Sequence, residues 1–295
     1  MNLDKLTTEK RNEKTMHLDE MSMEEILVLM NYEDQTVPKC VEKEIPQIKK
    51  VADAITTAFQ NGGRLIYIGA GTSGRLGILD AAECVPTFGT SSEKVVGLIA
   101  GGMSAMTAAV EGAEDSEELA NSDLKDLKLT NKDIVIGITA SGRTPYVVGG
   151  LKYAKEIGAT TASISCNKNA IISTYATISI EIEVGPEILT GSTRLKSGTA
   201  QKLVLNMLST VSMIGIGKIY KNLMVDVQPT NEKLVERSKR IIMQATDCTY
   251  EEASGSFENA NRDVKLAIVM LLTNLGMDEA KDRLKQAKGF VRKTL

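Results

Sequence analysis

The chain has no tryptophan, and aromatic residues make up only 4% of it. Proteins that bind single-stranded nucleic acid stack bases on aromatic side chains, so this scarcity argues against that role. The net charge of −3 also provides no broad attraction to nucleic acid or to an anionic membrane. We therefore expect partners of neither kind, although a local basic pocket for a small anion is compatible with this charge.

Histidine and paired cysteines are equally scarce. His17 is the one histidine of the sequence, and the four cysteines lie far apart without a CxxC pair. Zinc sites and thiol redox motifs need such residues at close spacing. The sequence therefore predicts no metal site and no redox motif.

Long apolar segments are missing too. No uncharged apolar run reaches the roughly 18 residues that a membrane-spanning helix needs. The charged start, MNLDKLTTEKRNEKT, lacks the apolar core of a signal peptide. We expect a cytoplasmic enzyme or binding protein.

Short apolar runs alternate with helical patterns through the first two-thirds of the chain. The runs occupy residues 64–70, 95–100, 134–139, 161–165 and 177–184. Such runs are typical of parallel strands that are buried on both faces. Because helical patterns separate most of them, they predict an α/β fold with a doubly wound, mostly parallel sheet flanked by helices.

Helical patterns without strands follow the sheet region. They predict a small C-terminal helical module at residues 230–295, after an N-terminal helical arm at 1–50 and a sheet domain at 51–229. The helices are expected at Met21–Met30, Val37–Gln60, Arg75–Glu83, Met103–Glu118, Tyr146–Ile157, Leu195–Tyr220, Glu232–Ala245, Thr249–Phe257, Arg262–Leu275 and Asp278–Ala287.

A glycine-rich turn, GAGTSGR (69–75), follows the first predicted strand and opens a helix. Glycine lets a ligand approach the backbone, and free N–H groups at a helix start attract anions. A plain strand-to-helix turn would have the same spacing. The second predicted strand ends in residues 100–102 without the acidic residue of a dinucleotide site, and the GK[ST] ending of a P-loop is missing.

Two further polar segments follow later strands. TASGRTP (139–145) combines hydroxyls, an arginine and a first-turn proline, which together suit a phosphate monoester. GPEILTGSTRLKSGTAQK (185–202) places hydroxyls and cations at the start of a long helix. Ordinary polar turns and a solvated helix cap are the alternatives.

Two glutamates are candidates for proton transfer. Glu83 ends the predicted helix after the glycine-rich turn, and Glu114 follows an apolar stretch. Acid–base catalysis often uses two carboxyl groups in different environments. Most glutamates, however, are solvated surface groups, and the chain has many other carboxylates.

These segments together carry a family resemblance. Residues 69–89, 111–120, 140–146 and 185–202, followed by NLMVDVQPTN (222–231), resemble the N-acetylmuramic acid 6-phosphate etherases. More widely, the chain is similar to sugar isomerase (SIS) domain proteins, including the glucokinase regulatory protein. The resemblance covers nearly the whole chain, and its C-terminal module resembles small ubiquitin-associated-like bundles.

The resemblance implies a lyase that works in peptidoglycan recycling. It would cleave the D-lactyl ether of N-acetylmuramic acid 6-phosphate to N-acetylglucosamine 6-phosphate and D-lactate. The C2–H of the open-chain sugar is acidic because C1 is an aldehyde, so syn β-elimination followed by addition of water accomplishes the cleavage. This chemistry needs no cofactor. The family also implies a homodimer that acts on a small sugar phosphate.

The resemblance also implies roles for particular residues. Glu83 corresponds to the proton donor to the lactyl oxygen, in surroundings that we expect to be partly apolar. Glu114 corresponds to the second acid–base residue, which handles C2–H or the incoming water. The implied substrate-binding residues are Gly71, Thr72, Ser73, Ser141, Gly142, Arg143, Thr144, Glu187 and Ser192.

Two other functions on the same fold are open alternatives. A sugar-phosphate isomerase would carry a glutamate before the Leu-Lys of a related segment, where this chain has Arg194. A non-enzymatic sugar-phosphate sensor would typically be longer, with tandem SIS domains. The presence of both glutamates beside one SIS domain favours the lyase.

Overall fold

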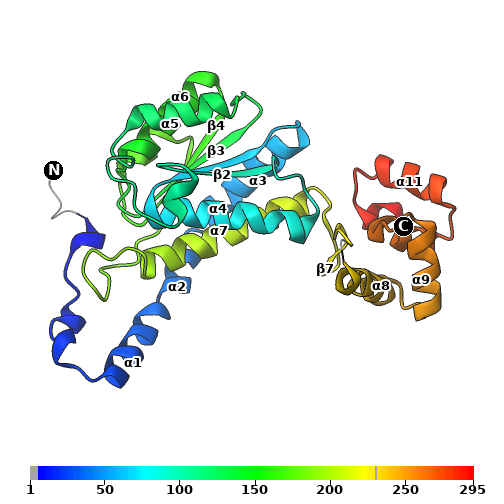
Figure 1. Ribbon diagram of the computed structural model, residues 1–295, viewed down its shortest axis with the longest axis horizontal. Helices are drawn as coiled ribbons and strands as arrows, with labels where there is room; N and C mark the ends of the chain where they lie inside the picture. Colours follow the sequence, from blue (N-terminus) through cyan, green and yellow to red (C-terminus); the bar gives the residue numbers. More distant parts are fainter. Residues whose placement is uncertain (1–5, 230) are drawn as a thin grey trace. The chain divides into compact units, whose positions relative to one another are not determined.

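The computed structural model describes residues 6–229 and 231–295, which form two compact units (Figure 1). The first unit extends to Ala81 and continues from Glu93 to Ser209, and the second contains Ala82–Ser92 and Thr210–Leu295. The helices and strands are α1 (Met23–Asp34), α2 (Val37–Glu42), α3 (Ile45–Gln60), β1 (Leu65–Gly69), α4 (Gly71–Phe88), β2 (Val95–Ile99), α5 (Glu117–Asp126), β3 (Ile134–Thr139), α6 (Pro145–Ile157), β4 (Thr160–Ser165), β5 (Ile178–Glu181), α7 (Lys196–Gly215), β6 (Ile219–Tyr220), β7 (Leu223–Met224), α8 (Glu232–Thr246), α9 (Tyr250–Asn259), α10 (Val264–Thr273) and α11 (Met277–Gln286).

A parallel sheet with the strand order β2-β1-β3-β4-β5 forms the centre of the first unit. Leu65 of β1 lies opposite Val95 of β2 on one side and Ile134 of β3 on the other. Every residue of β1 and β3 is buried, because helices cover both faces of the sheet. The predicted doubly wound α/β fold is confirmed.

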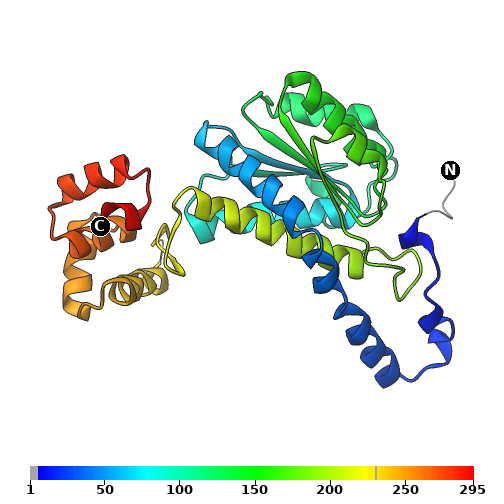
Figure 2. The same ribbon diagram turned by 180° about the vertical axis from the view of Figure 1, so that it is seen from behind.

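Two helix layers enclose this sheet. α5 and α6 lie on one face, and α3 lies on the other with the parts of α4 and α7 that belong to this unit (Figures 1 and 2). A Cβ on Gly150 of α6 would lie 2.4 Å from Ile68 Cδ1, and one on Gly77 of α4 would lie 2.9 Å from Tyr67 Cβ. Successive residues of a strand point to opposite faces, so Tyr67 and Ile68 each contact a different layer.

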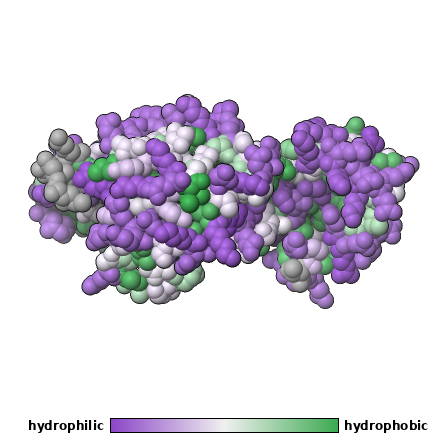
Figure 3. Space-filling view, turned by 90° about the horizontal axis from the view of Figure 1, so that it is seen from above, coloured by the Kyte–Doolittle hydropathy of each residue, from purple (hydrophilic) through white to green (hydrophobic). Residues whose placement is uncertain are grey.

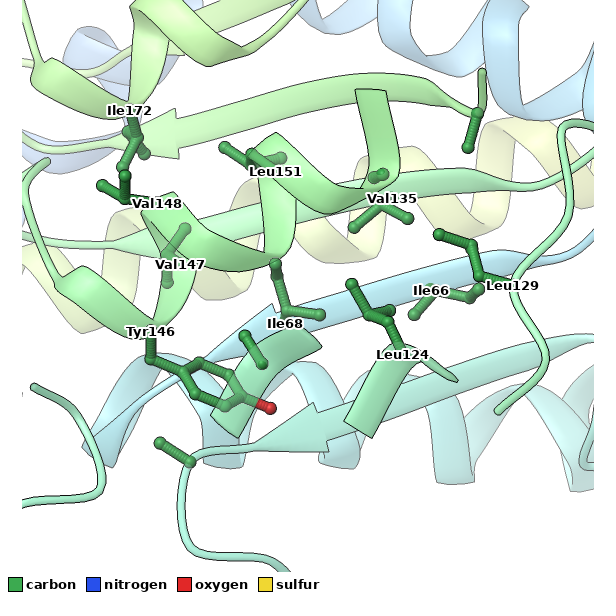
Figure 4. Packing of buried hydrophobic residues seen from close by; sticks show 14 of the residues in the cluster. Ile66, Ile68, Leu124, Leu129, Val135, Tyr146, Val147, Val148, Leu151 and Ile172 are labelled. Carbon is green, nitrogen blue, oxygen red and sulfur yellow. The ribbon is translucent and has the colours of Figure 1, made fainter. Parts of the chain in front are cut away.

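Aliphatic side chains fill the space between the sheet and the α5–α6 layer (Figure 4). Ile66 and Val135 from the strands and Leu124 and Leu151 from the helices are all fully buried. Each such side chain contributes roughly 1.5–3 kcal/mol relative to an exposed position. Hydrophilic residues dominate the outer face drawn in Figure 3. None of the described helices is long and apolar enough to cross a bilayer.

The second unit is built around a separate core of helices α8–α11 and the β6–β7 hairpin. Val225 and Tyr220, which precede residue 230, are buried in this core with Phe257 and Ile268. The compact unit therefore begins earlier than the expected boundary near residue 230, because the hairpin packs on the helices. It also includes the segment Ala82–Ser92.

Four of the predicted helices differ from the structure. The helix expected at Leu195–Tyr220 ends at Gly215, because Gly217 has φ +77° and Ile219–Tyr220 form β6, and α4 extends beyond the expected Arg75–Glu83 at both ends. The single helix expected at residues 37–60 is divided into α2 and α3, because Pro46 in the first turn of α3 has no N–H for the carbonyl of Glu42 and its ring would clash with that carbonyl in a continuous helix. The helix expected at residues 103–118 is only a 3-10 turn at Met103–Met106. Gly112 has φ +74°, and Ser116 caps α5, so the residues between form a loop that carries Glu114.

One buried carboxyl group connects three elements of the first unit. Asp80 of α4 accepts hydrogen bonds from Tyr67 Oη of β1 at 2.9 Å and from Ser209 Oγ of α7 at 3.0 Å. Burial raises the pKa of Asp80 to about 6, although both hydroxyl groups favour the charged form. The folded protein therefore holds this proton more tightly than the unfolded chain, in which an aspartate has its ordinary pKa.

This raised pKa predicts that the variant Asp80→Asn is more stable than the wild type at neutral pH. The stability of the wild type should fall as the pH rises from about 4 to about 6, because in this range Asp80 is ionised in the unfolded chain but still protonated in the folded protein. Asparagine stays neutral, so the variant should gain about 1–3 kcal/mol above pH 6 and nothing at pH 4. Urea unfolding at pH 4 and pH 7.5 measures the difference. An equal effect at both pH values would contradict the prediction.

Candidate active site

The glycine-rich turn lies where β1 ends and α4 begins. Gly71 has φ +51° and is exposed, whereas a Cβ on Gly74 would lie 2.7 Å from the oxygen of Gly69. Only glycines therefore let the helix start so close to the strand end. Ser73 is buried, and its Oγ donates to Gln201 Oε1 of α7 at 2.9 Å. Thr72 is half-buried beside it.

The second polar turn lies at the end of β3, the neighbour of β1. Thr139 Oγ1 lies 2.7 Å from Thr144 Oγ1 and 3.2 Å from Ser141 Oγ, so three hydroxyl groups form one cluster. Gly142 has φ +76°, and a Cβ there would lie 2.5 Å from the Cβ of Ala170. The parallel strands β1 and β3 flank the point where the strand order reverses, which is where such sheets bind ligands.

Arg143 supplies the positive charge of this turn. The guanidinium makes no hydrogen bond or ion pair with the described residues, and its Nε is buried without a partner. Pro145 starts α6 directly after Thr144, but the first N–H groups of this helix are already hydrogen-bonded, those of Val147 and Val148 to the oxygen of Thr144. The unpaired guanidinium and the hydroxyl groups are therefore the features that suit a phosphate group.

Glu114 lies beside the turn that contains Ser141, Arg143 and Thr144. Its backbone carbonyl accepts a hydrogen bond from the N–H of Tyr146, in the first turn of α6, at 3.0 Å. Its side chain is exposed and lines a cavity of about 330 Å³. The other lining residues come from the glycine-rich turn and the segment after β2: Ala70, Gly71, Arg75, Ala100, Ala105, Ala108, Ala109, Val110, Glu111, Gly112 and Asp115.

Arg75 holds one wall of this cavity in place. Its Nε donates to the oxygen of Met106 at 3.0 Å, and its Nη2 donates to the oxygen of Ala105 at 2.8 Å. Because its hydrogen bonds go to backbone carbonyls, Arg75 fixes the loop, whereas Arg143 is unpaired. The structure therefore brings Gly71, Glu114 and the 141–144 turn to one edge of the sheet.

The segment before α7 is organised by Glu187, which is fully buried. Its carboxylate accepts hydrogen bonds from the N–H groups of Lys196 and Ser197, both at 2.9 Å, and from Ser197 Oγ at 2.8 Å. Glu187 thus caps the start of α7. Ser192 is half-buried in the turn that leads to this helix. Contact of either residue with substrate stays a prediction.

The N-terminal arm supports the same helix start. Lys196 is buried, and its Nζ donates to Glu33 Oε2 of α1 at 2.8 Å. Burial alone would raise the pKa of Glu33, but hydrogen bonds and charge from Lys196 and Lys14 lower it to about 2. Sequence patterns do not indicate this pair, because its members are separated by 163 positions.

Gln201 is a further candidate that sequence reasoning did not single out. It is buried, accepts the hydrogen bond from Ser73, and its Nε2 has no partner among the described residues. Gln201 lies on the first turns of α7, inside the segment 185–202 that carries the family resemblance. Its place in this segment was the signal that the sequence offered. A buried amide donor beside the glycine-rich turn can bind a sugar hydroxyl.

Glu83 has a different environment. It is exposed on α4, belongs to the second compact unit and is not among the residues that line the cavity of the first unit. Cys84 and Phe88 on the same helix are buried. The partly apolar surroundings expected for Glu83 stay a prediction, since its side chain is exposed in the described chain.

No group of three or more histidine, cysteine, aspartate or glutamate side chains in the described part of the chain could hold a metal ion. The free cysteines Cys40, Cys84, Cys166 and Cys248 form no disulfide among the described residues. The absence of a cofactor stays a prediction from the chemistry of the reaction.

Comparison with known proteins first defines the class. Residues 47–155 match the family model of the glucokinase regulatory protein N-terminal SIS domain. A phosphoheptose isomerase from Francisella tularensis shares the fold, with a TM-score of 0.51 and 16% identity over 66% of this chain and 99% of that chain. With its parallel sheet and polar loops at the strand ends, the chain is a SIS-domain protein.

Much closer relatives define the family. N-acetylmuramic acid 6-phosphate etherase 2 of Lactiplantibacillus plantarum is 70% identical over 295 residues, which is 100% of both chains. The N-acetylmuramic acid 6-phosphate etherase of Bacillus cereus is 68% identical over 293 residues, covering 99% of this chain and 100% of the relative. This chain belongs to the N-acetylmuramic acid 6-phosphate etherase family, as its sequence segments predicted.

Proposed function

We propose that this chain cleaves the D-lactyl ether of N-acetylmuramic acid 6-phosphate, giving N-acetylglucosamine 6-phosphate and D-lactate in peptidoglycan recycling. A relative named N-acetylmuramic acid 6-phosphate etherase 2 is 70% identical to this chain over its full length, which supports this reaction. The main structural support for the site is the position of Glu114. It lines the cavity, and its backbone carbonyl accepts a hydrogen bond from the start of α6, which follows the 141–144 turn.

The 6-phosphate would bind at the turn from Ser141 to Thr144. Arg143 is the unpaired cation there, and the hydroxyls of Ser141 and Thr144 are donors. The sugar would then extend toward Gly71 and Glu114. The carboxylates of Glu111, Glu114 and Asp115 would repel a phosphate from the cavity itself. This charge distribution orients the substrate with its phosphate at one end.

The reaction proceeds through the open-chain aldehyde. A carboxylate removes the C2 proton, the C2–C3 double bond forms, and the C3–O bond breaks while the lactyl oxygen receives a proton. D-lactate leaves, water adds to C3, and C2 is protonated again. We assign the protonation of the lactyl oxygen to Glu83 and the C2 or water step to Glu114.

The assembly that we propose is a homodimer in which a second copy completes the site. Glu83 is solvent-exposed and does not line the cavity that contains Glu114. The apolar side chains of Met23, Leu27 and Val28 on α1 are 64–86% exposed, which suits a surface covered by a partner. Sedimentation equilibrium should give about twice the 31.9 kDa chain mass. A fully active monomer would contradict the proposal.

Ser141→Ala tests the phosphate site. Loss of one charge-assisted hydrogen bond should weaken substrate binding by about 1–3 kcal/mol. The Michaelis constant and inhibition by N-acetylglucosamine 6-phosphate measure this change. Ser104→Ala is a matched control, because Ser104 is an exposed serine in the 3-10 turn after the neighbouring strand β2, where its Oγ donates to the oxygen of Gly101. Unchanged constants for Ser141→Ala would remove this turn from the site.

Incubation with N-acetylmuramic acid 6-phosphate and an assay for D-lactate test the proposed function itself. An isomerase would instead interconvert an aldose and a ketose phosphate, and a sensor would bind sugar phosphates without turnover. Because a phosphate monoester does not cross a bilayer unaided, we place the enzyme in the cytoplasm, where such esters form.

A further inference from the structure

The NLMVD segment, residues 222–226, is the part of the family resemblance that the proposed mechanism does not use. It contains β7 and lies in the second unit. Asp226 accepts a hydrogen bond from Lys265 Nζ at 2.7 Å, and Lys218 Nζ lies 3.3 Å from the same oxygen. The Asp226 side chain is 18% exposed, so both pairs are largely shielded from solvent.

Lys265 is buried although it lies on α10. Its Nζ also donates to the oxygen of Gly217 at 2.8 Å. A buried ammonium is costly unless it is paired and hydrogen-bonded, so these contacts have to be kept together. Lys265 therefore joins α10, the turn before β6 and the NLMVD segment at one point.

The same segment contacts the end of α4. Gly89 follows α4 directly, has φ +58°, and a Cβ there would lie 2.0 Å from the carbonyl oxygen of Asp226. The Gly89 N–H donates to the oxygen of Val85 at 3.0 Å and so closes the helix. Gly89, Asp226 and Val264 also line one cavity of about 290 Å³. The backbone of Asp226 thus lies against Gly89 at the end of α4. Gly89 is six residues after Glu83.

We propose that Asp226 and Lys265 are positioning residues for Glu83. The ion pair holds the backbone of Asp226 in place, and that backbone fixes Gly89 and the end of the helix that carries Glu83. This inference rests on the proposed role of Glu83 as the acid. It gives the helical unit a function in the reaction, because α10 supplies the ammonium group.

Lys265→Met tests the proposal, since methionine keeps the length of the side chain and removes its charge. Lactate turnover should fall by at least about tenfold, while the Michaelis constant changes by less than about twofold. Deuterium exchange at substrate C2 should continue, because only the acid is displaced. Amide hydrogen exchange of residues 82–92 should become faster in the substrate-free protein. Lys265→Arg, which keeps the charge, should restore most of the turnover.

Two controls separate positioning from stability. Phe257→Leu removes packing from the core of the same unit and should lower the melting temperature without lowering turnover below that temperature. Glu258→Gln breaks an exposed pair with Arg262 and should change neither. If Lys265→Met does not fold, Asp226→Asn provides the same test, because it keeps the shape and one oxygen while removing the charge.

Wild-type turnover and wild-type amide protection in Lys265→Met or Asp226→Asn would overturn the inference. Equal losses of turnover in Phe257→Leu at matched stability would also overturn it. If the wild-type enzyme releases no lactate, the proposed function fails, and the amide exchange of residues 82–92 still decides whether Lys265 holds the end of α4.

Discussion

Replacing Glu83 with glutamine should abolish D-lactate release while substrate binding persists. Glutamine keeps the shape of the side chain, but its amide cannot deliver a carboxyl proton to the leaving lactyl oxygen. General acid catalysis contributes about 10²- to 10⁴-fold, so turnover should fall by a factor in that range. Lactate release at saturating substrate measures turnover, and inhibition by N-acetylglucosamine 6-phosphate measures binding.

Proton exchange distinguishes the acid from the base in this variant. Uptake of deuterium at C2 requires the base alone, so Glu83→Gln should still exchange C2–H in deuterated water. Loss of both exchange and elimination with binding retained would make Glu83 the base and leave Glu114 as the acid. Wild-type lactate release would remove Glu83 from the mechanism.

Replacing Glu114 with glutamine should remove C2–H exchange and lactate release together. The amide cannot accept the C2 proton, and the expected loss of turnover is again about 10²- to 10⁴-fold. The loop should keep its place, because the Tyr146 N–H binds the backbone carbonyl of residue 114 and not the side chain. Deuterium uptake at C2 measures the first step directly.

Glu111→Gln is the matched control for Glu114→Gln. Glu111 is exposed and lines the same cavity, so this change removes one equivalent charge from the same wall. It should keep most of the wild-type turnover. If Glu111→Gln is the inactive variant and Glu114→Gln exchanges C2–H normally, the base has been assigned to the wrong carboxylate.

The two inactive variants together test the shared site. In a dimer of one Glu83→Gln chain and one Glu114→Gln chain, one of the two sites would contain both native carboxylates. Mixing and reassociating the variants should therefore restore about one quarter of the wild-type rate. No restoration in a mixture shown to contain heterodimers would place both glutamates in one chain's site.

The sheet was predictable because its strands are buried on both faces. Runs such as residues 64–70 and 134–139 have no polar face, so they mark β1 and β3 without any knowledge of their neighbours. The glycines and hydroxyls that follow these strands mark the carboxyl ends of the strands, where we propose that the ligand binds, for the same local reason. Most C-terminal helices also matched to within two residues, because their caps and breaks are local.

The loop that carries Glu114 was not predictable in the same way. Residues 103–118 have a helical pattern, but in the structure only Met103–Met106 form a 3-10 turn, Gly112 has left-handed backbone, and Ser116 caps the start of α5. The buried pair of Glu33 and Lys196 was equally hidden, since a charged residue in a sequence is expected to be exposed. Both features depend on contacts with distant segments.

The sequence by itself therefore determined the class of fold, the family and the polar turns that can hold a sugar phosphate. These follow from local hydrophobic pattern, glycine placement and segments that extend over many residues. Only the tertiary structure decided that Glu114 shares an edge of the sheet with Arg143, that Glu187 caps α7, and that the end of α4 rests on Asp226. The physical reason is that such contacts depend on long-range packing, to which neither residue's neighbours in the sequence give any signal.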